Sequence, residues 1–502
     1  MGLRIPLGRP AMPGVRAEAP FGNLAHRVSA ILGAMKYEDA QLNGSRPSAA
    51  ALKVLGALEV AGLEAWIVGG WVRDALRGAA SHDIDMCCSG TWQASAAALE
   101  RAGIGVVESG IKFGGITAIA DGERIEVTTY RVDGFYTDGR HPEEVRFSER
   151  VEEDLARRDF TVNAMAWHPA RGLLDLYDGE GDLGRGLIRA VGHAQTRFEE
   201  DALRMLRAVR FACRLGFSVE GETARALAAC APLLDAIARE RVGVELAGIL
   251  ATRAGGEAMR LYPEVICAAI PELAAGRGFD QRSPYHIYDV YEHTARVLSA
   301  ASSLPGPDGA DGAPSPSLMW AALLHDVSKP ACFTLDKRGR GHFYGHPEAG
   351  AAVARAVMRR LGLAERLVRD ACRLIRYHDE PLERDRESLL GMLRKLSGEG
   401  ADAPRLMGEL LDLKNADALG KAPACHGYVD EIERMRALVG ELLEAGEAYD
   451  LKTLDLTGRD LIAAGVAPGK EIGRLLDAAL TATIAGEVEN ARAALLAYLG
   501  LS

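Results

Sequence analysis

Two aspartates one residue apart, Asp83 and Asp85, are the residues of this sequence best suited to chemistry. They lie in the run HDIDMCC, whose short length and apolar content predict a β-strand. Residues i and i+2 of a strand point to the same face, so both carboxylates share one face while Ile84 turns to the core. Two like charges this close suppress each other's ionisation unless a cation lies between them. The pair therefore predicts a site for Mg²⁺, which commonly binds one or two carboxylates together with substrate phosphates.

A third carboxylate is expected beside this pair, although a lone Asp-x-Asp is also found in solvated turns. In the run RIEVTTYR, strand alternation places Glu126 on the polar face. Three carboxylates on adjacent strands can hold two metals for in-line phosphoryl transfer. The run IVGGWVRD precedes the pair, and there Gly69 and Gly70 allow the backbone to approach a triphosphate, with Arg73 as a bidentate partner.

The elements that must position these residues change in character along the chain. Short runs rich in β-branched residues dominate to about residue 168, and Ala/Leu/Arg-rich periodic stretches follow from about residue 190. The first pattern is typical of strands and the second of helices. We therefore expect an α+β protein, with a small head built on a mixed β-sheet and a long all-helical body. The Pro/Gly/Ser-rich stretch 301–317 is expected to be a flexible surface loop.

Composition narrows the class of protein. The 502 residues are too many for one core and predict three or four domains. Hydrophobic and charged contents of 48% and 26% are typical of a soluble globular protein, and no apolar run approaches the length of a membrane helix. The N-terminus lacks the apolar core of a secretory signal, and the eight cysteines are scattered without a CxxC, which predicts reduced thiols in the cytoplasm and no zinc site. The net charge of −11 argues against non-specific coating of nucleic acid but leaves a local basic groove open.

Four motifs in one order resemble those of a known family. GGWVRD, DID, RRDFTVNAMAW (157–167) and EEDALRMLRAVRFA (199–212) resemble the class II CCA-adding tRNA nucleotidyltransferases and poly(A) polymerases, which have a polymerase β-like head. The resemblance covers roughly residues 50–500. It implies addition of CCA to the tRNA 3′ end from CTP and ATP, with release of pyrophosphate and Asp83, Asp85 and Glu126 as the catalytic carboxylates. The family's Lys-His-Gly-Thr run reads KFGGIT here, with Phe113 and Gly115 as departures.

The resemblance also implies how the bases are chosen. Asp201 and Arg204 lie three apart on a predicted helix and would form an amino-acid template, with Glu200 orienting Arg204. A carboxylate accepts and a guanidinium donates, which fits the amino group and ring nitrogen shared by cytosine and adenine. Against uracil or guanine, buried polar groups would stay unpaired. The alternative is an ordinary helix ion pair, which contributes little.

Further nucleotide and tRNA contacts are implied by the same resemblance. Arg157 and Arg158 would meet phosphates and Asp159 a ribose hydroxyl, although Asp159 is also a plausible helix cap. The segment 136–147 resembles the flexible loop that switches the family from C to A addition. Glu245 is expected to support the template helix. The remaining candidate nucleotide ligands are Asp74, Asn163 and Arg207, and the candidate tRNA-phosphate contacts in the tail are Arg459, Lys470 and Arg474.

A second set of metal ligands lies farther along the chain. A lone histidine on a helix is more often structural, but here YEHTARVL, LLHDVSKP, FYGHPEAGA, RYHDEP and KNADALG follow one another. They resemble the H…HD…D pattern of HD-domain metal phosphohydrolases. Imidazole with carboxylate suits Mn²⁺, Ni²⁺ or Co²⁺ better than Mg²⁺. The implied ligands are His293, His325, Asp326 and Asp417, with His346 and His378 as a second-metal set or phosphate contacts.

The sequence therefore predicts a CCA-adding enzyme with an HD domain, whose partners are the tRNA 3′ end, CTP and ATP. Its alternatives are a poly(A) polymerase, an enzyme that adds only CC or only A, and an HD phosphohydrolase whose head merely binds RNA. The HD domain would be an active cyclic phosphodiesterase or phosphatase, or a vestigial support for tRNA. The expected regions are a poorly ordered extension (1–45), the head (46–170), a helical neck that selects nucleotides and binds RNA (171–275), the HD domain (276–420) and a helical tRNA-binding tail (421–502).

Overall fold

The structure is a computed structural model that describes residues 41–81, 83–111, 114–133, 145–304, 312–398 and 400–501. Its described residues form two compact units. The first runs to residue 192 without 186–188, and the second contains 186–188 and everything from 193 onwards. The predicted class is confirmed, because the first unit is built on a mixed sheet and the second is helical apart from short strands.

The first unit, which we call the head, contains a seven-stranded sheet in the order β3-β4-β5-β2-β1-β8-β9. Only β2 and β5 pair in parallel, and every other neighbouring pair is antiparallel. The adjacent β6 and β7 form a separate antiparallel ladder. The strands are β1 (Ala65–Val68), β2 (Asp85–Cys88), β3 (Gly105–Val107), β4 (Gly115–Ala120), β5 (Glu123–Thr129), β6 (Arg131–Asp133), β7 (Val145–Phe147), β8 (Met165–His168) and β9 (Gly172–Asp175).

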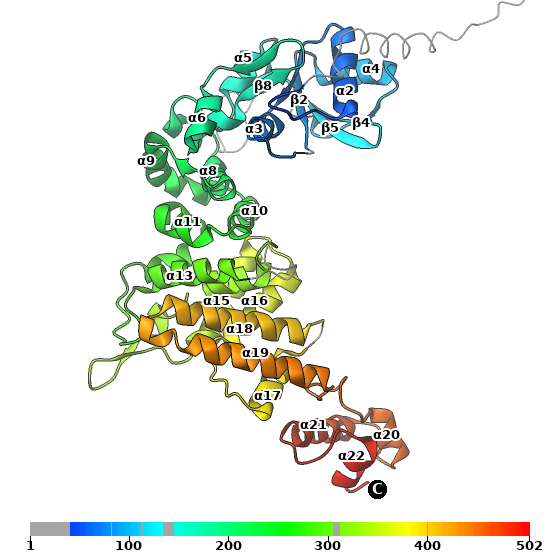
Figure 1. The fold of residues 1–502 in the computed structure, drawn as a ribbon, viewed down its shortest axis with the longest axis vertical. Helices are drawn as coiled ribbons and strands as arrows, with labels where there is room; N and C mark the ends of the chain where they lie inside the picture. The colour runs from blue at the N-terminus through cyan, green and yellow to red at the C-terminus, as the bar shows by residue number, and fades with distance from the viewer. Residues whose placement is uncertain are drawn as a thin grey trace, which may run out of the picture. The chain divides into compact units, whose positions relative to one another are not determined.

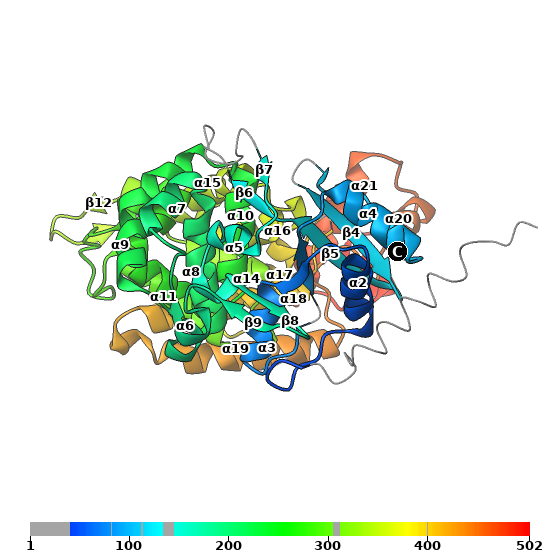
Figure 2. The same ribbon diagram turned by 90° about the horizontal axis from the view of Figure 1, so that it is seen from above.

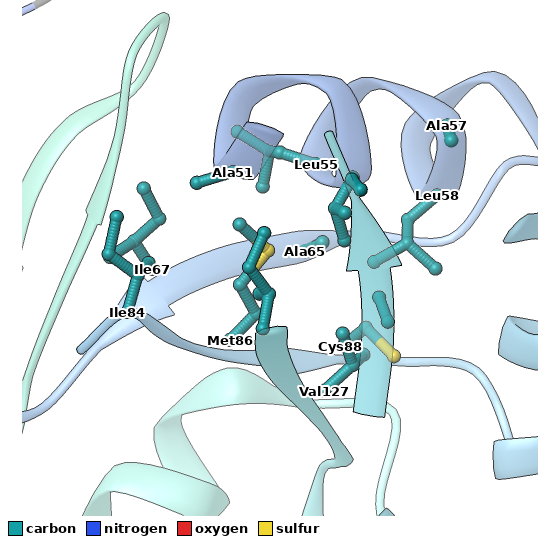
Figure 3. Close-up of a cluster of buried hydrophobic side chains, with 14 of the residues drawn as sticks. Ala51, Leu55, Ala57, Leu58, Ala65, Ile67, Ile84, Met86, Cys88 and Val127 are labelled. Carbon is teal, nitrogen blue, oxygen red and sulfur yellow. The ribbon is translucent and has the colours of Figure 1, made fainter. Parts of the chain in front are cut away.

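Both faces of the central strands are buried, which explains their nearly continuous apolar runs. On one face α2 (Ala49–Val60) and α4 (Trp92–Arg101) cover the main core, with Ile84, Met86 and Cys88 pointing into it (Figures 2 and 3). On the other face Cys87 joins a smaller cluster with residues of α5 (Val151–Ala156). Consecutive residues of β2 therefore fill opposite cores, and the inward orientation predicted for Ile84 is confirmed.

The remaining head elements are short and lie around one edge of the sheet. They are α3 (Gly70–Leu76), the 3₁₀ turn η3 (Thr161–Asn163) and α6 (Gly179–Arg185). The backbone enters α3 through Gly69, whose φ of 72° is in the left-handed region that favours glycine. A Cβ on Gly69 would lie 3.1 Å from a guanidinium nitrogen of Arg158. This close approach explains the first glycine of the GGWVRD motif.

The second unit is a succession of helices, coloured green to red in Figure 1. Within it α18 packs against α13 on one side and α19 on the other, and α15 packs against α16 (Figure 1). The helices are α7 (Ala194–Glu200), α8 (Leu203–Leu215), α9 (Gly221–Cys230), α10 (Arg239–Leu250), α11 (Gly255–Leu261), α12 (Pro263–Ala269), α13 (Val290–Ser303), α14 (Pro316–Leu324), α15 (His346–Arg360), α16 (Glu365–Tyr377), α17 (Arg386–Leu396), α18 (Ala403–Gly420), α19 (Tyr428–Glu444), α20 (Gly458–Ala463), α21 (Lys470–Ile484) and α22 (Arg492–Tyr498).

Several local predictions need correction. The body is not all helical, because β10 (Leu187–Ile188) pairs with β11 (Ser218–Val219), and β12 (Thr334–Leu335) pairs with β13 (Gly341–His342). The predicted loop 136–147 ends in β7, and the predicted loop 301–317 begins inside α13 and ends inside α14. Most of the N-terminal extension and the centres of both loops lie outside the described residues.

Two other findings bear on the sequence analysis. Among the described residues, none of the helices combines the length and apolar character required to cross a bilayer. All eight cysteines carry free thiols, as expected from their scattered positions. The division into five regions is not resolved by the two compact units and stays a prediction.

Candidate active site and metal centre

The three predicted catalytic carboxylates lie on neighbouring segments of the head sheet. The parallel register of β2 and β5 sets Asp85 directly opposite Glu126. Asp83 lies two residues before Asp85 and just outside the strand, which begins at Asp85 rather than at the predicted histidine. Asp83 and Glu126 are exposed, and Asp85 is half-buried. The three acids thus line one edge of the sheet.

Electrostatics at Asp85 indicate that this edge suits a cation. Burial, together with the charges of Asp83 and Glu126, raises the pKa of the Asp85 carboxyl to about 6, and the charge of Arg158 opposes this rise. Like charges crowded in this way are stabilised when a divalent cation lies between them. The donor set, three carboxylates, fits the oxygen ligands of Mg²⁺.

A hydrogen-bond network joins the glycine motif to the segment after α5. The buried Arg73 guanidinium donates to both carboxylate oxygens of Asp74, at 2.9 and 2.8 Å, and to Oδ1 of Asn163 at 2.8 Å. Asn163 in turn donates to Asp159 at 3.3 Å. Four predicted nucleotide ligands are therefore connected side chain to side chain. Because the guanidinium of Arg73 already has these partners, it holds the loop at Gly69 and Gly70 in shape.

Arg157 and Arg158 are held by a residue that the sequence analysis missed. Asp154, fully buried on α5, accepts hydrogen bonds from Nε of Arg157 at 3.0 Å and from Nη2 of Arg158 at 3.1 Å. Burial disfavours the charged form of Asp154, but Arg158 and Arg157 outweigh it and lower the pKa of the carboxyl. The spacing of three and four residues from Asp154 to the two arginines was visible in the sequence. The single carboxylate of Asp154 therefore holds both guanidinium groups in place.

The predicted base-reading pair does not lie on one helix. Asp201 has extended backbone angles between α7 and α8, and its Oδ1 accepts the backbone N–H of Leu203 at 3.0 Å. The prediction of a continuous helix is wrong here because aspartate before a helix satisfies its free N–H groups. Arg204 lies on α8 and donates to Glu200 at 2.7 Å. The predicted orienting role of Glu200 agrees with this contact.

Two contacts from α10 support the same segment. Arg241 donates to the other oxygen of Asp201 at 3.2 Å, a contact between distant residues that no local pattern reveals. Glu245, predicted to support the template helix, accepts from Arg210 of α8 at 2.6 Å. Arg207, the remaining candidate on α8, lies over the ring of Phe211 at 5.5 Å from its centroid. Helix α10 thus fixes both Asp201 and α8.

In the second unit, four histidines and an aspartate converge from α13, α15 and the C-terminal ends of α14 and α16. Nε2 of His293 and Nε2 of His325 lie 3.3 and 3.1 Å from Oδ2 of Asp326. Nε2 of His346 and Nε2 of His378 lie 3.5 and 3.6 Å from Oδ1 of the same carboxylate. Each pair of histidines forms, with Asp326, a group whose ligand atoms lie within 4.8 Å of one another. One buried carboxylate between two imidazole pairs is the arrangement expected of a two-metal centre.

The histidines are oriented for metal binding by their second ring nitrogen. Nδ1 of His293 lies 3.2 Å from the carbonyl oxygen of Gly420, and Nδ1 of His325, His346 and His378 lie 2.9, 2.8 and 2.6 Å from carbonyl oxygens of their own chain segments. A carbonyl oxygen only accepts, so each Nδ1 carries a proton, and in the neutral ring each Nε2 then presents a lone pair. All four lone pairs are directed to the centre.

Lysines accompany the two acidic ligands. Nζ of Lys329 lies 2.7 Å from Oδ2 of Asp326, and Lys421 pairs with Asp417. Burial disfavours ionised Asp326, but the charges of His325 and Lys329 hold its pKa well below the ordinary range. Within the described residues, neither Asp326 oxygen accepts a well-directed hydrogen bond. Asp417 lies 3.1 Å from Nε2 of His293 but belongs to neither group of three ligands. The histidines and Asp326 are ligands suited to divalent metals, and Asp417 lies next to this set through its contact with His293.

The candidate tRNA contacts of the tail lie on α20 and α21. Lys470 is the first residue of α21, and Arg474 on the same helix donates to Glu471 at 2.9 Å. Arg459 lies on α20, whose N-terminus carries a capping box made by Thr457 and Asp460. These three basic residues therefore lie on neighbouring helices, and their contact with tRNA phosphates stays a prediction.

Four family models match separate stretches of the chain. Residues 65–189 match the poly A polymerase head domain, and residues 290–421 match the HD domain. Residues 216–265 match an RNA- and SrmB-binding site of polymerase A, and residues 430–499 match domain 2 of tRNA nucleotidyltransferases. Both the nucleotidyltransferase and the HD domain depend on divalent metals, in keeping with the two ligand sets.

Individual proteins resemble the chain over most of its length. A CCA-adding enzyme of Limosilactobacillus fermentum is 32% identical over 452 residues, which cover 89% of this chain and 95% of the relative. One of Lactobacillus delbrueckii is 30% identical over 90% of this chain and 97% of its own length. The crystal structure of the Bacillus stearothermophilus CCA-adding enzyme in complex with CTP superposes with a TM-score of 0.64 at 26% identity, covering 90% of this chain and 96% of that one. With these relatives and with carboxylates and histidines in the arrangement described, the chain belongs to the family of CCA-adding enzymes.

Proposed function

We propose that the protein adds the nucleotides C, C and A to the 3′ end of tRNA, using CTP and ATP and releasing pyrophosphate. The observation that carries this proposal is the carboxylate set at the sheet edge, where Asp85 faces Glu126 across parallel strands and has a pKa raised to about 6. A protein that only bound RNA would gain nothing from three crowded acids in this position. The proposed reaction would take place in the cytoplasm, where tRNA is processed in bacteria.

The residues of the head have different roles in the proposed reaction. Asp83, Asp85 and Glu126, once ionised, would hold Mg²⁺, which would supply charge neutralisation at the triphosphate and activation of the tRNA 3′-hydroxyl towards the α-phosphate. Arg158, fixed by Asp154, lies close to a Cβ position at Gly69 and would meet the phosphates there. Glycine at that position leaves the guanidinium accessible. Asp159 remains the candidate partner of the ribose hydroxyl.

Base selection is assigned to Asp201 and Arg204. Both side chains are pre-oriented, Asp201 by Arg241 and the N–H of Leu203, and Arg204 by Glu200. A rigid acceptor and a rigid donor discriminate well, because a base with the wrong pattern leaves them unpaired in a desolvated site. The template therefore accepts cytosine and adenine and rejects uracil and guanine.

An extension assay tests this function. Purified protein is incubated with a tRNA transcript that lacks CCA, together with CTP, ATP and Mg²⁺, and both product length and pyrophosphate release are measured. We expect three added nucleotides and three equivalents of pyrophosphate, and no product from Asp83→Ala. Extension by the Asp83→Ala variant at the wild-type rate would refute the catalytic assignment. Extension with ATP alone into long products would favour the poly(A) polymerase alternative.

We infer a second activity for the HD centre, hydrolysis of phosphoesters with a transition metal such as Mn²⁺, Ni²⁺ or Co²⁺. The observation that favours it is the intact set of four oriented imidazoles around Asp326. A vestigial domain would have no reason to keep four side chains fixed in one tautomer. Hydrolysis of a 2′,3′-cyclic nucleotide and of p-nitrophenyl phosphate, measured with each metal, tests the inference. The absence of any turnover with every metal would leave the domain as a support for tRNA binding.

A further inference from the structure

A cavity on the head lies beside the aspartate segment and belongs to none of the sites described above. It has a volume of about 750 Å³ and is lined only by residues of the head, including Arg46, Arg124 and Ser48. Its wall also contains Ser81 and Ile84, which lie two residues before Asp83 and directly after it. The cavity therefore adjoins the chain segment that carries the catalytic carboxylates.

Arg124 connects the cavity to the third carboxylate. Alternation along β5 places Arg124 on the same face as Glu126, with the buried Ile125 between them pointing to the core. In the parallel register that pairs Asp85 with Glu126, Asp83 lies two residues before Asp85 and Arg124 lies two residues before Glu126. Within the described residues, no ion pair is found for the Arg124 side chain. Its charge is directed to the solvent beside three acids rather than to a protein partner.

The other positive feature of the cavity is the N-terminus of α2. Ser48 caps this helix by accepting the N–H of Ala51 at 3.1 Å, so the cavity wall includes the positive end of a helix of 12 residues. The first turn of α2, all of it described, has no acidic side chain to neutralise that end. Arg46 precedes the cap by two residues and also lines the cavity. Among the described residues that line the cavity, Glu123 is the only acid, and the guanidinium groups of Arg46 and Arg124 lie on the same wall as the helix N-terminus.

We propose that this cavity binds a phosphate of the RNA strand that is being extended, with Arg46 and Arg124 as its ligands. The proposal rests on the proposed nucleotidyl transfer, because it assigns the cavity to the RNA that supplies the attacking 3′-hydroxyl. Phosphate recognition by Arg and by helix N-termini is the usual way in which proteins fix the register of a nucleic acid without reading its sequence. Bound there, the strand is anchored next to Asp83, and its end reaches the carboxylates.

Binding measurements with the full-length protein test the proposal. The dissociation constant for a tRNA lacking CCA is measured without nucleotide at several salt concentrations, and the affinities for CTP and pyrophosphate are measured separately. Arg124→Ala and Arg46→Ala should each weaken RNA binding about tenfold and reduce the slope of log Kd against log salt by about 0.7–1. The affinity for CTP should stay within about twofold of wild type, and Arg124→Lys should restore part of the loss.

Two further variants act as controls and have different expected results. Glu123→Gln removes the one acid of the cavity and should tighten RNA binding, whereas Arg101→Ala removes an exposed charge from α4 and should change nothing. Weaker binding of CTP or pyrophosphate with unchanged RNA affinity in Arg124→Ala would overturn the proposal and assign the cavity to free nucleotide. Equal RNA affinity in all variants would also overturn it. Failure of the wild type to extend tRNA in the same preparations would instead refute the proposed function, so the two failures are distinguishable.

Discussion

Asp85 and Glu126 lie directly opposite each other on β2 and β5, the only parallel neighbours in the head sheet. An antiparallel pairing would have run the two segments in opposite directions, and Asp83 would then have lain beside a different part of β5. The parallel register instead brings three carboxylates to one edge. The connection through α4, β3 and β4, which lie between the two strands in the sequence, is what makes this register available.

The first prediction concerns stability and pH at Asp85. Its folded pKa of about 6 is above the ordinary value of 3.8, so the stabilisation from its bound proton is complete below pH 3.8 and is lost as the pH rises through 6. In metal-free protein, Asp85→Asn should therefore raise the free energy of unfolding above pH 6 by about 1–3 kcal/mol. The gain should shrink towards zero near pH 4. Urea unfolding in EDTA at pH 4.5 and pH 8 measures it.

The control for this prediction is Glu108→Gln, which removes an exposed charge from the same unit. It should leave the free energy of unfolding nearly unchanged at both pH values. Added Mg²⁺ should reduce the difference between wild type and Asp85→Asn, because it stabilises only the carboxylate. If Asp85→Asn were less stable than wild type at pH 8 without metal, the repulsion inferred among Asp83, Asp85 and Glu126 would be contradicted.

The second prediction concerns base selection. Asp201→Ala or Arg204→Ala should raise the incorporation of U and G relative to C by roughly tenfold or more, since a lost polar contact of this kind costs about 1–3 kcal/mol. Arg241→Ala should show a smaller loss of selectivity, because Arg241 acts only by fixing Asp201. Competition between CTP and UTP on one tRNA measures the ratio. Unchanged selectivity in both template variants would mean that the bases are read elsewhere.

The third prediction separates the two metal sites. His325→Ala should remove a transition metal from the purified protein and abolish phosphoester hydrolysis, because His325 supplies one of the converging lone pairs beside Asp326. CCA addition should persist, since the carboxylates of the head belong to the other compact unit. Elemental analysis and both activity assays on the same preparations measure the three outcomes.

His426→Ala, on the same unit but outside both ligand groups, is the matched control and should retain the metal. Loss of CCA addition in a folded His325→Ala protein would show that the two sites are not independent. Retention of a full metal complement by that variant would contradict the ligand assignment.

The fourth prediction concerns Asp154, which anchors Arg157 and Arg158 from a fully buried position. Removing one partner of a buried ion pair typically costs about 3–5 kcal/mol, because the remaining charge is left uncompensated. Asp154→Ala should lower the stability of the head by an amount of this order, and Glu152→Gln on the same helix should change it little. Chemical unfolding followed by tryptophan fluorescence compares the two. A mild effect of Asp154→Ala, similar to that of Glu152→Gln, would mean that the guanidinium groups find other partners.

Local pattern was sufficient to predict some of these features. Strand alternation placed Asp83, Asp85 and Glu126 on polar faces and Ile84 in the core, and the structure agrees. That β5 would lie beside β2 was expected from the carboxylate pattern, but the parallel pairing and its register were not, because pairing partners depend on contacts between distant residues. The histidine motifs were likewise visible singly, whereas their convergence on the two oxygens of Asp326 required the packing of α13, α14, α15 and α16.

Other features could not be predicted, for identifiable physical reasons. The break before α8 was missed because the apolar period runs through residue 201, while the side chain of Asp201 caps a new helix there. Arg241 reaches Asp201 from another helix, which no spacing rule reveals. Asp154 was missed although its spacing to Arg157 was visible, because the pattern does not show that the acid is buried.

The order of nucleotide addition tests the central claim most directly. A tRNA transcript that ends before CCA is incubated with purified protein and Mg²⁺, with CTP alone, with ATP alone and with both, and the 3′ ends are sequenced. We predict CC with CTP alone, no addition with ATP alone, and CCA followed by termination with both. Runs of A from ATP alone, products that stop at CC when both nucleotides are present, or unchanged 3′ ends in every reaction would contradict the account.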